Sequence, residues 1–452
     1  MIYYIQKWYN FTMFKSIFTN SSGILFSRIL GFIRDLLSAS ILGANIYSDI
    51  FFVAFKLPNL FRRIFAEGAF TQSFLPAFSK AKYKPSFAYN TLKKFFFIIL
   101  ILSIIVTLFA PYITEILAFG FSNEAKEIAS PLIAINFYYL DFIFLVTFLA
   151  SLLQYKNHFA TTAFSTALLN ISLIVSLLLA YNKPPLTIIY YMSFGVIIGG
   201  LLQLIAHLIA SHKYKLDKLL LIGCKSKKED KQAQKDFNKA FLPSVFGNST
   251  AHISAFLDTW LATFLVSGSI SYLYYANRLF QLPLALFAIA TSVAIFPKLS
   301  KYLNNNQEKE AFKILKKGFW FLFGILSIAT LIGYFGAELI VKILFERGAF
   351  THTDTINSAE VLKMYILGLL PFGLVKIFSS YLYSTHRHLK AAKISALSLG
   401  GNIVLSLILI YPLGASGLAL ASTLTGYILF FLTIKEFGFE NFKQILKALL
   451  HK

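Results

Sequence analysis

The sequence predicts an all-α, polytopic membrane transporter. Hydrophobic residues make up 57% of the 452-residue chain and charged residues only 14%, whereas a soluble domain carries about 25% charged residues. Runs such as 95–110 and 318–335 are apolar on both faces. A transmembrane strand needs only about 10 residues of alternating polarity, whereas a membrane helix needs about 20. Because helices satisfy their own backbone hydrogen bonds in lipid, we expect a helical bundle.

Apolar segments along the chain predict about twelve transmembrane helices of roughly 20 residues or more. The short tail 437–452 has the pattern of an amphipathic helix on the membrane surface. The expected spans are 17–43, 48–80, 92–119, 129–154, 159–181, 186–211, 238–266, 271–300, 312–345, 357–384, 389–411 and 413–436.

The loops between these segments alternate between lysine-rich and lysine-poor, which predicts orientation through the positive-inside rule. Lysines gather at 80–94, 156, 213–239, 298–317 and 390–393. We therefore expect a multi-pass protein of the bacterial cytoplasmic (inner) membrane with both termini in the cytoplasm. The rule also accounts for the net charge of +22, so we expect membrane lipids rather than nucleic acid as partners, and a monomer.

The hydrophilic stretch 212–240 divides the chain into two parts. We expect an N-terminal lobe (1–211) and a C-terminal lobe (241–436) of about six helices each, joined by a cytoplasmic basic linker. Three short echoes in matching order support an internal duplication. An even number of helices per repeat gives a parallel pseudo-repeat, in which substrate lies between lobes and access alternates. The echoes are 74–80 with 295–301, 155–158 with 384–387, and 169–171 with 401–403.

Charged side chains within the predicted spans carry the functional argument. A charge at bilayer depth costs from about 3 to more than 10 kcal/mol, so it faces water, a partner or a ligand. Arginines exceed acids there, which indicates a cavity for an anion, and the arginine fork suits phosphate. Structural ion pairs with snorkelling arginines are the alternative, and they suit Arg28 or Lys56 individually. The basic residues are Arg28, Arg34, Arg62, Arg63, Arg278 and Lys56, and the acids are Asp35, Asp49 and Glu67.

Helical spacing predicts how these charges group. Arg28 and Asp35 are seven residues apart and should share a face, while Arg34 should point elsewhere. In the second span the charges at 49, 56, 63 and 67 fall on one continuous stripe. That stripe gives Arg63 a structural partner, so Arg34, Arg62 and Arg278 are the stronger substrate candidates, with Arg28 a fourth.

Four motifs resemble the MurJ (MviN) lipid II flippases of the MOP exporter superfamily, and the resemblance covers most of residues 13–436. The motifs are Ser27-Arg-Ile-Leu-Gly-Phe-Ile-Arg-Asp35, the stretch Asp49-Ile-Phe-Phe-Val-Ala-Phe-Lys-Leu-Pro-Asn-Leu-Phe-Arg-Arg-Ile-Phe-Ala-Glu-Gly-Ala-Phe70, Tyr274-Tyr-Ala-Asn-Arg-Leu279 and Leu344-Phe-Glu-Arg-Gly-Ala-Phe350.

The resemblance implies a two-lobed, V-shaped transporter that moves lipid II, the undecaprenyl-diphosphate-linked peptidoglycan precursor, to the periplasmic leaflet. It implies that Arg28, Arg34, Arg62 and Arg278 line the central cavity and that Asp35, Asp49 and Glu67 serve gating. Lys56 and Arg63 belong with these acids as ion-pair partners. Some members are similar in holding a sodium ion, whose ligands would here be Asp258, Asn402 and Ser422, or Thr423 as the third.

This sequence departs from the family pattern at three points. Asn277 stands where many members have an acid, and Ser406 replaces a second acidic sodium ligand, which leaves one carboxylate. The family usually has fourteen spans, whereas about twelve are expected here from runs of roughly 20 residues.

Other functions fit the sequence less well. A flippase for another polyprenyl-diphosphate-linked glycan fits the charges equally well, and only the motifs argue against it. A cation-exporting drug transporter would want acids in the cavity, and a lipid-binding scaffold would use the arginines structurally. No acid–base or metal constellation suggests an enzyme, and the single cysteine, Cys224, excludes a disulfide framework.

Overall fold

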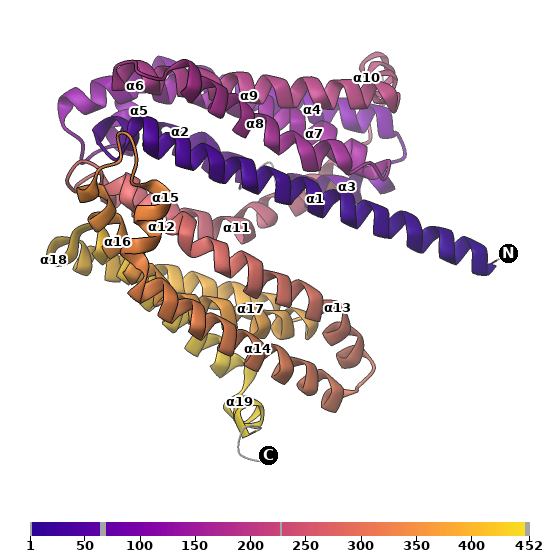
Figure 1. The fold of residues 1–452 in the computed structure, drawn as a ribbon. Coiled ribbons are helices and arrows are strands. Elements are labelled where there is room, and N and C mark those ends of the chain that lie inside the picture. The colour runs from indigo at the N-terminus through magenta and orange to yellow at the C-terminus, as the bar shows by residue number, and fades with distance from the viewer. Residues whose placement is uncertain (1, 64–68, 227, 448–452) are drawn as a thin grey trace. The chain divides into compact units, whose positions relative to one another are not determined.

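The computed structural model describes residues 2–63, 69–226 and 228–447, and side chains are described for 19, 21–63, 69–226, 228–245 and 252–447. All regular structure in these ranges is helical, which confirms the predicted fold class. The chain forms two compact units, Met1–Phe256 (unit 1) and Leu257–Lys452 (unit 2). Figure 1 shows their helices in chain order.

Unit 1 contains the helices from α1 to most of α11, and unit 2 contains the rest. The helices of unit 1 are α1 (Ile2–Leu42), α2 (Ile46–Phe61), α3 (Thr71–Lys80), α4 (Lys84–Leu108), α5 (Ala110–Leu117), α6 (Asn123–Phe137), α7 (Tyr139–Tyr155), α8 (Ala160–Leu179), α9 (Pro185–Lys213), α10 (Leu216–Lys225) and α11 (Lys231–Ala262). Those of unit 2 are α12 (Ser269–Pro283), η2 (Leu284–Ile289), α13 (Ala290–Asn304), α14 (Glu308–Phe335), α15 (Ala337–Phe345), α16 (His352–Ile366), α17 (Leu369–Ser384), α18 (His388–Phe437) and α19 (Phe439–Leu446).

An aromatic core holds one end of unit 1 together. Phe70 stacks on Phe74 at 5.3 Å between ring centroids, and Phe74 stacks on Phe78 at 5.4 Å. Phe237 from the first half of α11 packs edge-on against Phe70 at 5.7 Å. Such pairs add about 0.5–1.5 kcal/mol each beyond their buried area. They explain why the units divide within α11, after Phe256, rather than at the hydrophilic linker.

Small residues allow the long helices of unit 1 to pack closely. Helix α8 lies between α1 and α9, and α9 also packs on α7. A Cβ added at Gly199 would come within 2.9 Å of the Leu169 backbone, and one at Gly23 within 2.8 Å of the Ala163 backbone. Glycine at these positions lets membrane helices approach without a large hydrophobic driving force.

Helix α18 of unit 2 reverses direction. Its backbone leaves helical geometry at Gly414, with φ 56° and ψ −131°, two residues after Pro412. Glu436 near its end accepts hydrogen bonds from Lys390 Nζ at 2.6 Å and from an Arg387 NH1 at 3.2 Å. The two limbs of α18 therefore correspond to the predicted spans 389–411 and 413–436.

Two turns repeat the predicted echo between the halves. Asn157 and His386, which occupy matching positions, both have left-handed backbone conformations, with φ of 59° and 58°. The next residue donates from its backbone N–H across the turn in both cases, His158 to Leu153 at 2.9 Å and Arg387 to Leu382 at 2.8 Å. The same geometry also ends a helix at Asn306, where the Gln307 N–H donates to Tyr302 at 2.8 Å. Because this helix ending is common, the duplication stays a prediction.

Eight helical segments in the described part of the chain are long and apolar enough to cross a membrane. One of them, α18, holds two predicted spans, and the predicted spans 17–43, 48–80 and 238–266 are not among the eight. The count of about twelve spans therefore stays a prediction based on the roughly 20 residues that each helix needs. Large apolar side chains are exposed along these segments, among them Leu108 at 71% and Phe335 at 81%. Exposed apolar surface of this extent fits contact with lipid.

Candidate functional site

Arg34, Asp35 and Asn170 form one polar cluster inside unit 1. The Arg34 guanidinium donates to Asp35 Oδ1 through NH2 at 2.6 Å and through Nε at 3.1 Å, and to Asn170 Oδ1 through NH1 at 3.1 Å. The Asn170 amide in turn donates to the Ser27 carbonyl at 3.0 Å. The Asp35 side chain is 1% exposed and that of Arg34 is 12% exposed. The guanidinium is therefore held in a defined orientation by charge-assisted hydrogen bonds.

This cluster corrects the expectation that Arg34 points away from Asp35. The arginine side chain is long enough to curl back to its chain neighbour, which helical spacing of Cβ positions does not capture. Arg28, expected to share a face with Asp35, is exposed. Asn170 was not predicted as a site residue, although a lone asparagine in an apolar span, already singled out by the internal echo, was a usable signal.

Arg62 caps the end of α2. Its Nε and NH2 donate to Asn59 Oδ1 at 3.1 and 2.9 Å, one turn earlier. Its positive charge also acts on the hydroxyl group of Tyr139, a residue that is 1% exposed. Asn59 and Tyr139 are thus further neighbours of a predicted substrate residue. The sequence offered no signal for Tyr139, because a tyrosine in an aromatic-rich span is unremarkable.

The predicted stripe on the second span runs from buried to exposed. Asp49 is 2% exposed in the first turn of α2, where a carboxylate is favoured by the helix dipole. Asn45 caps the same turn and accepts from the Tyr47 N–H at 2.9 Å. Lys56 is half-buried and Arg63 is exposed. Glu67 lies outside the described residues.

In unit 2, Arg278 lies on α12, which contains no acidic residue. Its guanidinium carbon sits 5.8 Å from the centroid of the Tyr274 ring, one turn earlier. Asn277 accepts a hydrogen bond from the Gln281 side chain. Beyond Pro283 the helix continues as the π-helical segment η2. Such segments are rare and often occur at functional sites.

Two of the predicted sodium ligands lie together in unit 2. Ser422 Oγ donates to Asp258 Oδ2 at 3.2 Å, whereas Thr423 donates to the Met364 carbonyl at 2.6 Å. Asn402 is 2% exposed, and the buried Ser406 hydroxyl one turn later has no hydrogen-bond partner among the described residues. Carboxylate, amide and hydroxyl oxygens are ligands suited to hard cations. The described residues contain no cluster of three or more His, Cys, Asp or Glu side chains.

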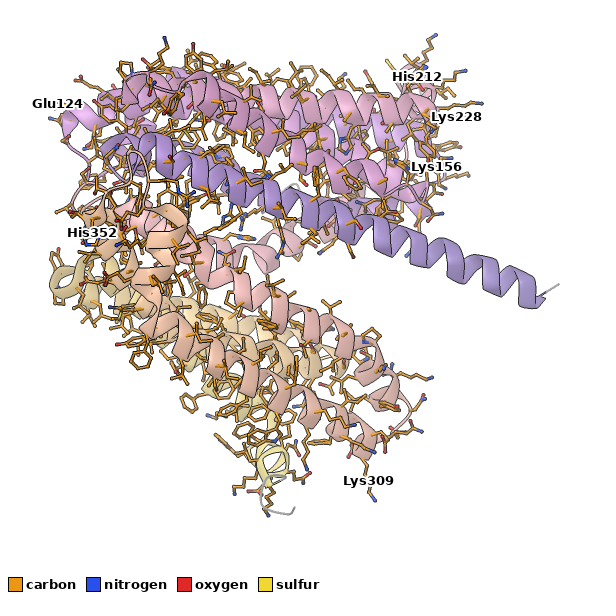
Figure 2. The ribbon with its side chains drawn as sticks, viewed as in Figure 1. Glu124, Lys156, His212, Lys228, Lys309 and His352 are labelled. Atoms are coloured by element: carbon orange, nitrogen blue, oxygen red, sulfur yellow. The ribbon has the colours of Figure 1, made fainter. Side chains whose placement is uncertain are left out.

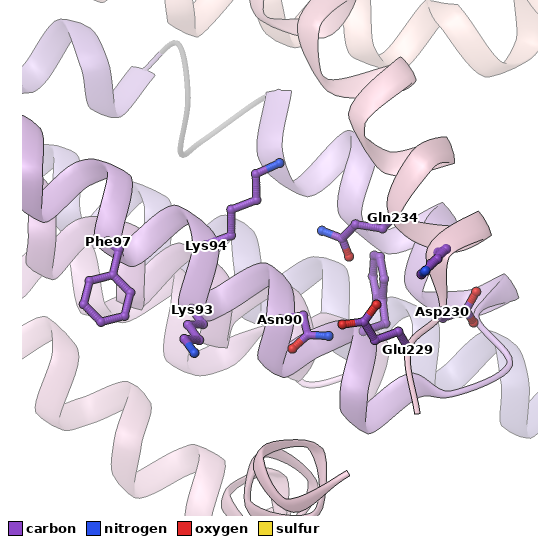
Figure 3. Close-up of a pocket in the computed structure, with 9 residues that line it drawn as sticks. Asn90, Lys93, Lys94, Phe97, Glu229, Asp230 and Gln234 are labelled. Atoms are coloured by element: carbon purple, nitrogen blue, oxygen red, sulfur yellow. The ribbon is translucent and has the colours of Figure 1, made fainter. Parts of the chain in front are cut away.

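Lysines gather at one end of unit 1, where Figure 2 places Lys156 and Lys228, while Glu124 lies at the opposite end. At this lysine-rich end a cavity of about 410 Å³ lies between α4 and the segment leading into α11. Figure 3 shows the side chains that line it. The basic linker is largely helical, since α10 and the start of α11 lie within it. Helix α10 packs on α4. The lining residues are Phe87, Asn90, Lys93, Lys94, Phe97, Glu229, Asp230, Lys231 and Gln234.

Asp230 ties this segment to the turn before α4. Its carboxylate accepts from the backbone N–H of Ala233 at 3.1 Å, which caps α11, and from those of Lys82 at 2.6 Å and Tyr83 at 3.2 Å. The hydrogen bond from Ala233 is the largest cause that holds the pKa of Asp230 below its usual range, and those from Tyr83 and Lys82 add to it.

Asp230→Ala is expected to lower the free energy of unfolding by about 0.5–2 kcal/mol, the usual cost of losing an N-cap. Asp230→Asn should cost less, because asparagine also caps helices. Since the folded-state pKa is lowered, the contribution of the charge is present above the unfolded pKa of about 4 and is lost as the pH falls further. Thermal unfolding of the purified protein from pH 7 to pH 3 measures this. A difference between wild type and Asp230→Asn that does not shrink at low pH would contradict it.

Comparison with known proteins now places this chain. The family model described as "Lipid II flippase MurJ" matches residues 38–452. The chain belongs to this family. A relative from Helicobacter pylori strain J99, named "Probable lipid II flippase MurJ", is 49% identical over 423 residues, which cover 91% of this chain and 92% of the relative. A relative of the same name from Buchnera aphidicola subsp. Schizaphis graminum is 37% identical over 447 residues, covering 95% and 84% of the two chains.

Solved structures agree with family membership. A structure titled "Lipid II flippase MurJ, inward closed conformation" matches with a TM-score of 0.79 and 27% identity, covering 95% of this chain and 90% of that one. An inward-facing MATE multidrug transporter of the MOP superfamily matches with a TM-score of 0.69 at 12% identity, covering 93% and 96%. The second likeness shows the fold alone. The first likeness agrees with the predicted family, and both confirm the predicted helical architecture.

Proposed function

We propose that this protein moves lipid II from the cytoplasmic to the periplasmic leaflet of the bacterial inner membrane by alternating access of its two lobes. The observation that carries the proposal is the set of arginines on otherwise apolar helices, in a chain of the lipid II flippase family. An arginine surplus on apolar helices favours an anion, and the substrate of this family carries a diphosphate. The product supplies peptidoglycan synthesis and hence cell-wall growth.

In this proposal Arg34, Arg62 and Arg278 bind the diphosphate, with Arg28 as a fourth contact, while the polyprenyl tail stays in the bilayer. Support comes from the way the first two guanidinium groups are held. Arg34 is oriented by Asp35 and Asn170, and Arg62 by Asn59. A guanidinium whose rotamer is already set loses less entropy when it binds two phosphate oxygens.

The acids serve the conformational change. Asp35, Asp49 and Glu67 exchange ion pairs with Lys56, Arg63 and the cavity arginines between inward-open and outward-open states. Bending near Gly31 and Pro58 permits the change, since Pro58 removes a backbone donor from α2. An inside-negative membrane potential drives an anion outward by about 2.3 kcal/mol per charge per 100 mV. In the proposed orientation both termini lie in the cytoplasm, as does the lysine-rich end of unit 1.

Reconstituted vesicles test the proposal. Purified protein in vesicles that contain labelled lipid II, without ATP, should move the label between leaflets, as read by a membrane-impermeant enzyme or quencher. An undecaprenyl-diphosphate glycan without the peptide stem tests the runner-up substrate class. Equal movement of both lipids would support the broader glycan flippase, and binding without movement would favour a scaffold and overturn the proposal.

We also propose that Asp258, Asn402 and Ser422 hold a sodium ion in unit 2. Sodium, but not potassium, is expected to raise the thermal stability of the purified protein. Binding at ten times the dissociation constant stabilises the folded state by about 1.4 kcal/mol. Asp258→Asn should abolish the sodium effect because it removes the carboxylate.

Asp354→Asn is the matched control for this experiment. Asp354 is also a buried carboxylate of unit 2, but it accepts from Tyr272 and caps α16 through Thr351. It should lower stability without changing the sodium response. Stabilisation of Asp258→Asn by sodium to the same extent as wild type would refute the site.

A further inference from the structure

Unit 1 contains a row of buried polar side chains on α9 that the proposed function does not use. Gln203, His207 and Ser211 are four residues apart and therefore share one helix face. They are 2%, 0% and 3% exposed. Helix α9 is one of the segments apolar enough to cross the membrane. Ionisable and polar groups within a membrane-spanning segment are energetically costly and usually functional.

The hydrogen bonding of His207 defines its tautomer. Its Nδ1 lies 2.8 Å from the backbone carbonyl oxygen of Gln203. A carbonyl can only accept, so Nδ1 carries the proton, and in the neutral ring Nε2 holds a lone pair. Within the described residues that nitrogen has no hydrogen-bond partner. The ring is therefore a base whose accepting atom faces the interior.

Two more atoms on the same face lack partners among the described residues, Gln203 Oε1 and Ser211 Oγ. A buried polar atom that is left without a hydrogen bond is energetically costly. Buried water typically makes two to four hydrogen bonds to groups of this kind. Three buried polar atoms of this kind lie along one face of α9, so we expect ordered water there.

The row continues toward both ends of unit 1. On one side the Gln203 side chain lies beside the Tyr139 hydroxyl, which lies in the field of Arg62. On the other side His207 feels the charge of His158. The ring of His158 bonds to the Tyr214 hydroxyl at 3.0 Å and to Thr161 at 2.7 Å. His158 follows Lys156 and therefore lies at the lysine-rich end.

Two acids on the helices that pack against α9 have partners of their own. Helices α2, α6, α7, α8 and α10 pack against it, and α8 contains no titratable side chain. Asp141 on α7 accepts from Ser103 at 2.7 Å, and Asp217 on α10 pairs with His212 at 2.8 Å. The remaining titratable groups of these helices are Tyr47, Asp49 and Lys56 on α2, Glu124, Lys126 and Glu127 on α6, Tyr139 and Tyr155 on α7, and Lys218, Cys224 and Lys225 on α10.

We propose that this row is a hydrated proton-binding site, in which Nε2 of His207 accepts a proton that arrives through water entering at the lysine-rich end. The proton comes from hydronium, which leaves as water, and release to water reverses the step. The imidazolium then donates from both nitrogens, to the Gln203 carbonyl and to water. Its positive charge lies one helical turn from Gln203, which neighbours the Tyr139 hydroxyl in the field of Arg62. Protonation would therefore strengthen the field that attracts an anion, a link that rests on the proposed function.

The hydration and the protonation can be tested without transport. Full-length protein labelled with ¹⁵N-histidine in lipid nanodiscs should show a cross-peak between His207 and water, assigned by its loss in His207→Gln. Its Nε2 signal should move from the neutral to the imidazolium position as the pH is lowered from about 8 to about 4. Ser211→Ala keeps the ring but removes a water partner and should shift the midpoint. A His207 signal with no water contact and no titration would overturn the proposal.

The link to transport needs the vesicle assay at varied pH on the lysine-rich side. Wild-type protein should change its rate of lipid II movement at least threefold over that range, and His207→Gln should flatten the profile. His212→Gln, which alters an exposed histidine paired with Asp217, should keep it. Unchanged pH dependence in His207→Gln would refute the link. Absence of any lipid II movement by wild type would instead refute the proposed function, while the spectroscopic result stands by itself.

Discussion

Arg34→Ala is expected to abolish support of growth in a strain depleted of its own flippase, while the protein still inserts in the membrane. The change removes a guanidinium that is held ready for phosphate by Asp35 and Asn170. Hydrogen bonds to charged groups are worth about 1.5–3 kcal/mol, so lipid II exposure in the periplasmic leaflet should fall about 10- to 100-fold. Arg34→Lys should recover part of the activity, because lysine keeps the charge but lacks the fork.

A structural explanation of this loss can be separated from substrate binding. Arg34→Ala also leaves Asp35 without its partner at 2.6 Å, and an uncompensated buried charge is destabilising. The double change Arg34→Ala with Asp35→Asn removes that charge and should restore thermal stability without restoring lipid II movement. Asn170→Ala, which loosens the guanidinium without removing it, should give an intermediate defect. Normal periplasmic lipid II exposure in Arg34→Ala would refute the role of this residue.

Arg278→Ala is expected to cause a loss of similar size from the other unit. Arg278 lies over the Tyr274 ring at 5.8 Å on a helix without acids. The Tyr274 ring therefore helps to hold the guanidinium through a cation–π contact, which is worth about 0.5–2 kcal/mol. Growth of the depleted strain and lipid II exposure should both fail in Arg278→Ala. Tyr274→Leu should weaken both measurements less, because the charge remains.

Arg387→Ala provides the matched control in unit 2. This arginine is partly exposed and pairs with Glu436 at 3.2 Å, so its loss should cost less than about 1 kcal/mol and leave transport unchanged. Arg278→Lys separates charge from geometry, since lysine keeps the charge without the planar fork. Full activity of Arg278→Ala, with insertion equal to wild type, would remove this residue from the substrate site.

Much of the architecture follows from local pattern. The echo between 155–158 and 384–387 corresponds to two turns of the same left-handed geometry. The predicted spans 389–411 and 413–436 are the two limbs of α18, because the backbone leaves helical geometry at Gly414, two residues after Pro412. The π-helical segment after Pro283 had no such signal. Its backbone geometry depends on how neighbouring helices pack, not on its apolar sequence.

The candidate site was predictable in its residue types and less so in its partners. Arg34 was singled out because a charge in an apolar span is costly, yet its bonds to Asp35 and Asn170 depend on side-chain reach and on α1 packing against α8. Ser422 was one of two possible sodium ligands beside Asp258, and the hydrogen bond from Thr423 to Met364 distinguishes them. The row on α9 was missed, because Gln203 and His207 gain meaning only when the burial of that face is known.

The sequence by itself determined that this protein is a helical membrane transporter of the lipid II flippase family, with a positive surplus suited to an anion. Hydrophobic length, the distribution of lysines and contiguous motifs are local properties, and they survive without knowledge of packing. Only the tertiary structure decided which polar groups meet: Arg34 with Asn170 across 136 positions, Asp258 with Ser422, and the buried face of α9. The physical reason is that hydrogen bonds depend on distances of about 3 Å, and helix periodicity sets a face but not the neighbour against which it packs.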